Sequence, residues 1–305
     1  MPSWSLSDVP DLTGRTALVT GANSGLGFWT TVELARKGAR VLMGCRDAGR
    51  AEAALQRARA EVTGAQVELV TLDLQSLSSI EAAAKEVAAR TPSLDLLVDN
   101  AGIMATPRTL TEDGFEAQLG TNHLGHFALT GRLLPTLLEA RAPRVVVVSS
   151  GAHKPGKVAF DDLMGERSYG PWKAYSQSKL ANLLFVLELD RRARAAGSPL
   201  VVTAAHPGYA ATHLQDTDGL RGLAMKLGNR LLAQSDAAGA LPSVYAATAP
   251  DVSGGDYYGP DGPFEMRGTP TKVGRTKAAQ DTDVARRLWV VSEELTGVTY
   301  DALPG

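Results

Sequence analysis

Tyrosine and lysine stand four residues apart at Tyr175 and Lys179, in a stretch rich in alanine and leucine that predicts a helix over residues 172–196. In a helix this spacing places both side chains on one face. A phenol with a pKa of about 10 is a poor acid–base catalyst at neutral pH, but a neighbouring ammonium stabilises the phenolate and lowers that pKa. The pair is therefore a candidate for proton transfer to a reacting oxygen. Packing on the protein surface is the alternative for such a pair taken by itself.

Glycines gather directly after the first predicted strand, residues 16–20. Glycine lets the backbone turn tightly and approach a diphosphate closely, and the start of the helix predicted over residues 25–37 offers free N–H groups and the positive end of its dipole. The spacing is G-x-x-x-G-x-G, unlike the commoner G-x-G-x-x-G of dinucleotide-binding folds, and a plain structural turn is the alternative. We expect these residues to contact phosphate: Gly21, Asn23, Ser24, Gly25, Leu26 and Gly27.

The elements that must position these residues alternate between short β-branched runs and segments rich in Ala, Leu, Glu and Arg. We predict strands at residues 16–20, 40–44, 66–72, 94–98, 144–149, 200–205 and 256–259, and helices at 25–37, 48–62, 77–89, 114–139, 172–196 and 282–295, the fourth helix broken near Pro135. This order predicts an α/β fold with one doubly wound, mainly parallel sheet of about seven strands and helices on both faces. Such sheets bind ligands beyond the carboxyl ends of their strands. No Pro/Gly/Ser-rich linker divides the chain, so we expect one domain over residues 1–305, with a glycine-rich half at about 12–145 and a catalytic half at about 146–300.

Charge and composition exclude several classes of protein. The 31 basic and 33 acidic residues nearly cancel, and 44% of residues are hydrophobic, so neither a disordered chain nor a nucleic-acid-binding protein with a basic surface fits. No run approaches the roughly 18 apolar residues of a membrane helix, and the N-terminus does not resemble a signal peptide. The single cysteine, Cys45, excludes an internal disulfide and fits a reducing compartment, so we expect a cytoplasmic protein. Because no apolar run has the length of a membrane helix, we expect no membrane partner. His123 and His126 lack a third ligand nearby, so we expect no metal site.

Taken together, these motifs resemble those of the short-chain dehydrogenase/reductase family. Thr20 and the three glycines match every fixed position of its T-G-x-x-x-G-x-G motif, and residues 122–125 resemble its N-x-x-G segment. Tyr175 and Lys179 match its Y-x-x-x-K motif. The resemblance implies a Rossmann-fold oxidoreductase that transfers hydride between a nicotinamide cofactor and a carbonyl or alcohol substrate.

The resemblance also implies a role for each of four catalytic residues. In the family, a serine at the end of the fifth strand hydrogen-bonds the substrate oxygen, and as the second serine of a pair Ser150 is preferred to Ser149. Tyr175 would donate the proton, and Lys179 would lower the tyrosine pKa and hold the ribose hydroxyls. Asn122 would open a helix kink and hold a water that connects to the lysine.

The residues after the second strand bear on the choice between NADP and NAD. Cys45 stands where NAD-using relatives have an aspartate, whose carboxylate would repel a 2′-phosphate, and Arg46 follows it. We therefore expect NADP(H) rather than NAD. Asp47 leaves an alternative, in which it binds the ribose and Arg46 is a solvated charge, or it caps the next helix. Besides Tyr175 and Lys179, the cofactor contacts implied by the resemblance are Asp73, Leu74, Asn100, Ala101, Gly102, Pro207, Gly208 and Thr212.

One position departs from the family pattern. The N-N-A-G segment after the fourth strand is here D-N-A-G, with Asp99 in place of an asparagine. A buried carboxylate without partners is costly. We therefore expect Asp99 to have hydrogen-bond donors, to be protonated, or to be more exposed than in relatives.

The spacing between the catalytic motifs indicates a branch of the family. Ser150 and Tyr175 are 25 residues apart, and the extra segment, residues 153–171, resembles that of retinol dehydrogenases and their soluble bacterial relatives. The leucines of residues 209–234 suggest an apolar lid and a small to medium lipophilic substrate, although core packing explains them equally. Assembly as a homodimer or homotetramer is a further expectation. The alternatives are a cofactor-binding, redox-sensing regulator without turnover and a Ser–His hydrolase using His153, for which the G-x-S-x-G elbow is absent.

Overall fold

The strands form one sheet in the computed structural model, which describes residues 4–208 and 235–303. Within these residues eight strands pair in the order β3-β2-β1-β4-β5-β6-β7-β8. All neighbouring pairs are parallel except β7 and β8, which are antiparallel. The strands are β1 Thr16–Thr20, β2 Arg40–Cys45, β3 Val67–Thr71, β4 Leu96–Asp99, β5 Arg144–Val148, β6 Val201–Ala205, β7 Tyr257–Pro260 and β8 Pro270–Lys272.

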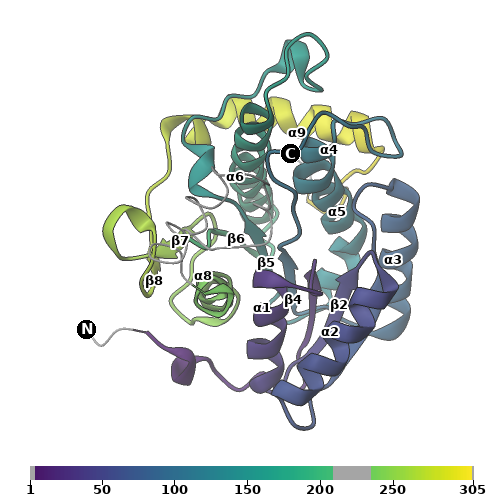
Figure 1. Cartoon of the computed structure of the whole chain (residues 1–305), viewed down its shortest axis with the longest axis vertical. Coiled ribbons are helices and arrows are strands. Elements are labelled where there is room, and N and C mark those ends of the chain that lie inside the picture. Colours follow the sequence, from purple (N-terminus) through teal and green to yellow (C-terminus); the bar gives the residue numbers. More distant parts are fainter. Residues whose placement is uncertain (1–3, 209–234, 304–305) are drawn as a thin grey trace, which may run out of the picture.

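Helices cover both faces of this sheet (Figure 1). On one face lie α1 Gly25–Arg36, α2 Ala48–Glu61 and α8 Asp236–Thr248. On the other face lie α3 Leu77–Arg90, α5 Gly125–Leu138, α6 Pro171–Ala195 and α9 Thr282–Thr296. The short helix α4 Ala117–Leu119 leads into a π-helical turn, Gly120–Leu124, before α5 begins. No helix of the described residues has the length and apolar character needed to cross a lipid bilayer.

The apolar strands supply two separate cores. In β5, Val145 and Val147 pack into the core under α5 and α6, whereas Val146 packs into the core under α1 and α8. Successive side chains of a strand point to opposite faces, so a strand with both faces covered is apolar throughout. This arrangement confirms the predicted doubly wound parallel sheet.

The structure corrects two details of the predicted elements. The predicted break near Pro135 is wrong, because α5 continues through this proline to Leu138. Although Pro135 lacks an N–H group, the buried leucines around it hold the helix in place. The irregular turn lies instead at Gly120–Leu124, around Asn122. The sheet also has an eighth strand, β8, which the sequence pattern missed because it is only three residues long and begins with a proline.

Candidate active site

Two cavities adjoin each other at the carboxyl ends of the strands. The first, of about 380 Å³, is lined by the glycine turn after β1 and by residues after β2, β3 and β4; we call it the glycine-rich cavity. The second, of about 340 Å³, is lined by residues after β4, β5 and β6, by α6 and by the β7–β8 loop; we call it the tyrosine cavity. Four residues line both cavities, so the two are continuous: Leu26, Asn100, Gly102 and Ile103. This place is the switch point of the sheet, where β1 has β2 on one side and β4 on the other.

The turn after β1 can exist only with glycines at its key positions. Gly21 and Gly25 have φ values of +66° and +55°, in the left-handed region that favours glycine. A Cβ on Gly27 would lie 2.5 Å from both the Gly21 carbonyl oxygen and the Asn100 amide nitrogen. The turn therefore packs directly on the chain leaving β4. Asn23, Ser24, Gly25 and Leu26 line the cavity at the N-terminus of α1, where backbone N–H groups can hold a phosphate.

Two basic side chains, Arg46 and Arg50, line the glycine-rich cavity after β2. Arg46 is 56% exposed, and its guanidinium lies 3.9 Å from Asp73, a distance at which an exposed ion pair contributes little. Asp47 caps α2 by accepting a hydrogen bond from the Arg50 backbone N–H at 2.8 Å. Of the alternatives for Asp47, the structure shows the helix cap. Arg50 also lines this cavity, and its position in the first turn of α2 is a signal in the sequence that was missed. Cys45 is buried, and burial raises the pKa of its thiol to about 11.

The residues predicted after β3 and β4 also line the glycine-rich cavity. Asp73 and Leu74 lie at the end of β3, with Asp73 accepting a hydrogen bond from the Gln75 N–H. Asn100 donates from its side chain to the Thr20 carbonyl at 2.8 Å. Ala101 and Gly102 complete this wall. A Cβ on Gly102 would lie 3.1 Å from the Asn122 side-chain oxygen and 3.5 Å from the Lys179 ammonium, so glycine allows both to approach.

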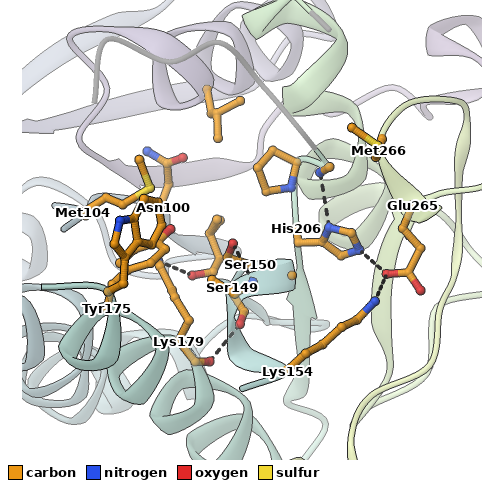
Figure 2. Close-up of a pocket in the computed structure, with 18 of the residues that line it drawn as sticks. Asn100, Met104, Ser149, Ser150, Lys154, Tyr175, Lys179, His206, Glu265 and Met266 are labelled. Carbon is orange, nitrogen blue, oxygen red and sulfur yellow. Dashed lines mark hydrogen bonds and ion pairs between the residues drawn. The ribbon is translucent and has the colours of Figure 1, made fainter. Parts of the chain in front are cut away.

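Ser150, Tyr175 and Lys179 meet in the tyrosine cavity, as Figure 2 shows. Tyr175 and Lys179 lie one turn apart on α6, and Ser150 follows β5 at the start of a short 3₁₀ turn. The Ser150 hydroxyl hydrogen-bonds the Tyr175 phenol. Ser149, by contrast, donates its hydroxyl to the Lys179 carbonyl at 2.8 Å and so serves to fix α6 against β5.

Burial governs the protonation of this pair. It raises the pKa of the Tyr175 phenol, and the hydrogen bond with Ser150 offsets part of that rise. Burial also lowers the pKa of the Lys179 ammonium to about 8, and this group donates to the Val148 carbonyl at 3.0 Å. The lowering of the Tyr175 pKa that we expected from Lys179 is therefore not the dominant effect here. Tyr175 is protonated at neutral pH, which is the form that can donate a proton.

Asn122 connects the elements around the two cavities. It lies in the π-helical turn, and its side-chain nitrogen donates to the Ile103 carbonyl and to the Ser178 hydroxyl, both at 2.9 Å. Its side-chain oxygen accepts the Ile103 N–H at 2.8 Å. Asn122 thus ties the chain leaving β4 to α6, beside Lys179.

The segment after β6 forms the opposite wall of the tyrosine cavity. Pro207 and Gly208 line it, and Gly208 has a φ of +68°. A Cβ on Gly208 would lie 2.5 Å from the Met266 carbonyl oxygen, so the β7–β8 loop packs on this glycine. Thr212 and the leucine-rich residues 209–234 lie outside the described residues.

Several residues of this wall were missed from the sequence. Glu265 lies 3.2 Å from the His206 imidazole and 3.6 Å from the Lys154 ammonium, as Figure 2 shows. Glu265 and the preceding Phe264 both have left-handed backbone conformations, with φ values of +57° and +56°. No local sequence pattern predicts that this loop lines the cavity, because its residues reach the cavity only through the pairing of β7 with β8. Trp172, Met104 and Met266 add apolar surface to the same cavity.

Asp99 is fully buried and has one hydrogen-bond partner, the Thr130 hydroxyl at 2.9 Å. Burial raises the pKa of its carboxyl to about 8. Of the three states expected for Asp99, a protonated carboxyl with one donor is therefore the one found at neutral pH. The side chains of His123 and His126 have different hydrogen-bond partners, Ser292 and Thr20.

Comparison with known proteins gives a consistent family assignment. Residues 15–220 match the model of the short chain dehydrogenase family. Retinol dehydrogenase 14 of Mus musculus is 43% identical over 300 residues, which cover 93% of this chain and 86% of that protein. Polyprenol dehydrogenase of Mus musculus is 41% identical, covering 95% of this chain and 86% of that protein. A crystal structure of an uncharacterised protein from Mycobacterium paratuberculosis is 46% identical, with a TM-score of 0.81 and coverage of 98% of this chain and 99% of that one. The chain therefore belongs to the short chain dehydrogenase family and is an oxidoreductase that acts on CH–OH or C=O groups.

Proposed function

We propose that this enzyme interconverts a carbonyl and an alcohol on a lipophilic substrate with NADP(H) as the hydride carrier. The observation that carries the proposal is the continuity of the two cavities. The glycine-rich cavity offers a helix N-terminus and closely packed glycines, and the tyrosine cavity offers a protonated phenol beside a serine hydroxyl. A ligand that spans both would present its reactive end to Tyr175.

The cofactor is assigned to residues that fit its parts. Gly21, Asn23, Ser24, Gly25, Leu26 and Gly27 would hold the diphosphate; Asp73, Leu74, Asn100, Ala101 and Gly102 the adenosine half; and Lys179, Pro207, Gly208 and Thr212 the nicotinamide half. Arg46 would hold the 2′-phosphate, with Arg50 beside it and no carboxylate at Cys45 to oppose it. When bound, the nicotinamide supplies or accepts the hydride.

The protein's own groups would handle the proton and the oxygen. In the reducing direction Ser150 donates a hydrogen bond to the carbonyl oxygen, and Tyr175 transfers its phenolic proton to that oxygen. Lys179 then stabilises the phenolate by its positive charge. Asn122 holds the chain leaving β4 against α6 and so keeps this group assembled.

Three observations support a lipophilic substrate. Apolar side chains dominate the wall around Tyr175: Ile103, Met104, Trp172, Phe264 and Met266. Trp172 and Phe264 are 56% and 90% exposed, although large hydrophobic side chains are normally buried. The relatives named above carry the names retinol dehydrogenase and polyprenol dehydrogenase, and both names denote lipophilic alcohols. A regulator without turnover is the weaker alternative, because Ser150, Tyr175 and Lys179, the proposed reacting groups, line one cavity.

Replacing the phenol tests the proposal. Tyr175→Phe removes the proton donor and leaves the glycine-rich cavity intact, so we expect NADPH binding to persist while turnover falls by about 10²- to 10⁴-fold. NADPH oxidation with retinal and with short and long aliphatic aldehydes measures turnover, and NADPH fluorescence measures binding. Tyr245→Phe, which alters a tyrosine bonded to Asp251 outside both cavities, is the matched control. Undiminished turnover in Tyr175→Phe would refute the mechanism.

A further inference from the structure

His126 is a buried imidazole that bonds to both halves of the site. It lies at the start of α5, one turn after Asn122, and is 1% exposed. Its Nδ1 lies 3.0 Å from the backbone carbonyl oxygen of Asn122. Its Nε2 lies 2.9 Å from the hydroxyl of Thr20, the residue that begins the glycine turn.

These two contacts determine where the protons lie. A carbonyl oxygen can only accept, so Nδ1 carries the hydrogen, and Nε2 of a neutral imidazole must then accept from the Thr20 hydroxyl. Burial lowers the pKa of His126 to about 4, which agrees with a neutral ring. With its own proton directed to the imidazole, the Thr20 oxygen accepts the backbone N–H groups of Asn100 and Ala101, both at 2.9 Å.

The hydrogen bonds therefore form one chain across the switch point. It begins at the Asn100 and Ala101 N–H groups and passes through Thr20 and His126 to the Asn122 backbone. The Asn122 side chain continues it to Ser178 on α6. The first end lines the glycine-rich cavity, and the second stands beside Lys179.

We infer that His126 is a positioning residue that couples the two cavities. Through Thr20 it fixes the wall that faces the adenosine half of the proposed cofactor, and through Asn122 it fixes the π-helical turn behind Lys179. The inference rests on the proposed function, because it assigns the two ends of the chain to cofactor affinity and to turnover.

Two substitutions of His126 each break one of its two hydrogen bonds and keep the other. In His126→Asn the amide nitrogen takes the place of Nδ1, so the bond to Asn122 is kept and the bond to Thr20 is lost. In His126→Gln the side-chain oxygen takes the place of Nε2, so the bond to Thr20 is kept and the bond to Asn122 is lost. We expect His126→Asn to weaken NADPH binding about 5- to 10-fold with kcat nearly unchanged, and His126→Gln to lower kcat by a similar factor with binding nearly unchanged.

A double-mutant cycle and a matched control exclude a general loss of stability. Thr20→Val should weaken NADPH binding as His126→Asn does, and the double variant should bind no more weakly than either single variant. His123→Asn alters the other buried histidine of this segment, which bonds Ser292 away from the cavities, so it should leave both NADPH affinity and kcat unchanged.

The inference is overturned by either of two results. One is that both His126 variants lose NADPH affinity and kcat equally, in proportion to the fall in their melting temperatures. The other is additive losses in the Thr20/His126 cycle. Because the cycle reads NADPH binding alone, it still decides whether His126 acts through Thr20 on the cofactor site if no substrate is turned over, a result that would count against the proposed function instead.

Discussion

Asp99 makes the stability of this protein depend on pH. Its carboxyl has a pKa of about 8 in the folded chain, far above the ordinary value of 3.8. Between about pH 4 and pH 8 the folded state therefore holds a proton that the unfolded state has released. Proton binding by the folded state alone means that the free energy of unfolding falls as pH rises through this window.

An asparagine at this position should remove that dependence. Asp99→Asn keeps the acceptor for Thr130, cannot ionise, and restores the N-N-A-G pattern of the family. We expect its melting temperature, relative to the unsubstituted protein, to be at least about 2 °C more favourable at pH 8 than at pH 5. Thermal unfolding of both proteins at the two pH values measures this difference. An equal difference at both pH values would show that the pKa of Asp99 is not raised in the folded protein.

Residue types and spacing along the chain are enough to predict the reacting groups of the candidate site. Tyr175 and Lys179 are one helical turn apart, and Ser150 follows a strand end, so each has a local signal. The protonation of the phenol could not be predicted in this way, because burial, which is a tertiary property, raises its pKa.

The β7–β8 loop is an element under backbone strain. Phe264 and Glu265 occupy the left-handed region, which costs a non-glycine residue of order 1 kcal/mol or more and is typical of functional sites. Contacts of Glu265 with Lys154 and His206 hold the loop against the tyrosine cavity. The strained backbone holds the exposed Phe264 ring at the tyrosine cavity, where it would cover part of the proposed lipophilic substrate.

Substituting Phe264 by glycine or by alanine distinguishes the effect of the ring from the effect of the backbone strain. Phe264→Gly removes both, and Phe264→Ala removes the ring alone. We expect both variants to raise KM for long aldehydes about tenfold, because similar apolar area is lost from the cavity wall. Phe264→Gly should have a higher melting temperature than Phe264→Ala, because only glycine relieves the left-handed backbone at this position. Kinetics with long and short aldehydes, with thermal unfolding, measure the two effects; unchanged KM in both variants would exclude Phe264 from substrate binding.

The β7–β8 loop is also one of the elements that the sequence pattern could not predict. Strands and helices with strong periodicity, such as β5 and α6, were predicted to within a few residues. The predicted break at Pro135 failed because packing of α5 outweighs the missing hydrogen bond, and β8 was too short to show a pattern. Glu265 reaches His206 only through the pairing of β7 with β8, so spacing along the chain could not predict this contact.

On the scale of the whole molecule, the proposed cofactor site joins the two halves of the sheet. The glycine turn belongs to the half containing β1, β2 and β3, and the residues after β4 belong to the other half. A ligand bound there contacts both halves and binds only the folded protein. It should therefore stabilise the entire fold by mass action.

Thermal shift with both nicotinamide cofactors tests this and the choice between them. At about 100 times its Kd, NADPH should add about 2.7 kcal/mol to the free energy of unfolding. At equal concentration NADH should give a smaller rise in melting temperature. In Arg46→Ala the NADPH shift should fall to that of NADH, and Arg57→Ala, an arginine that packs over Phe28, serves as the control. Equal shifts for both cofactors in the unsubstituted protein would contradict the NADP assignment.

The buried Cys45 also has a practical consequence. It is the only cysteine of the chain, and burial raises its pKa to about 11, so the thiolate that reacts with maleimides is scarce at neutral pH. A cysteine introduced on the surface would therefore take up a fluorophore or spin label with little background from the native thiol. The protein is thus suited to site-specific labelling, by which distances between the β7–β8 loop and the glycine turn could be followed in solution.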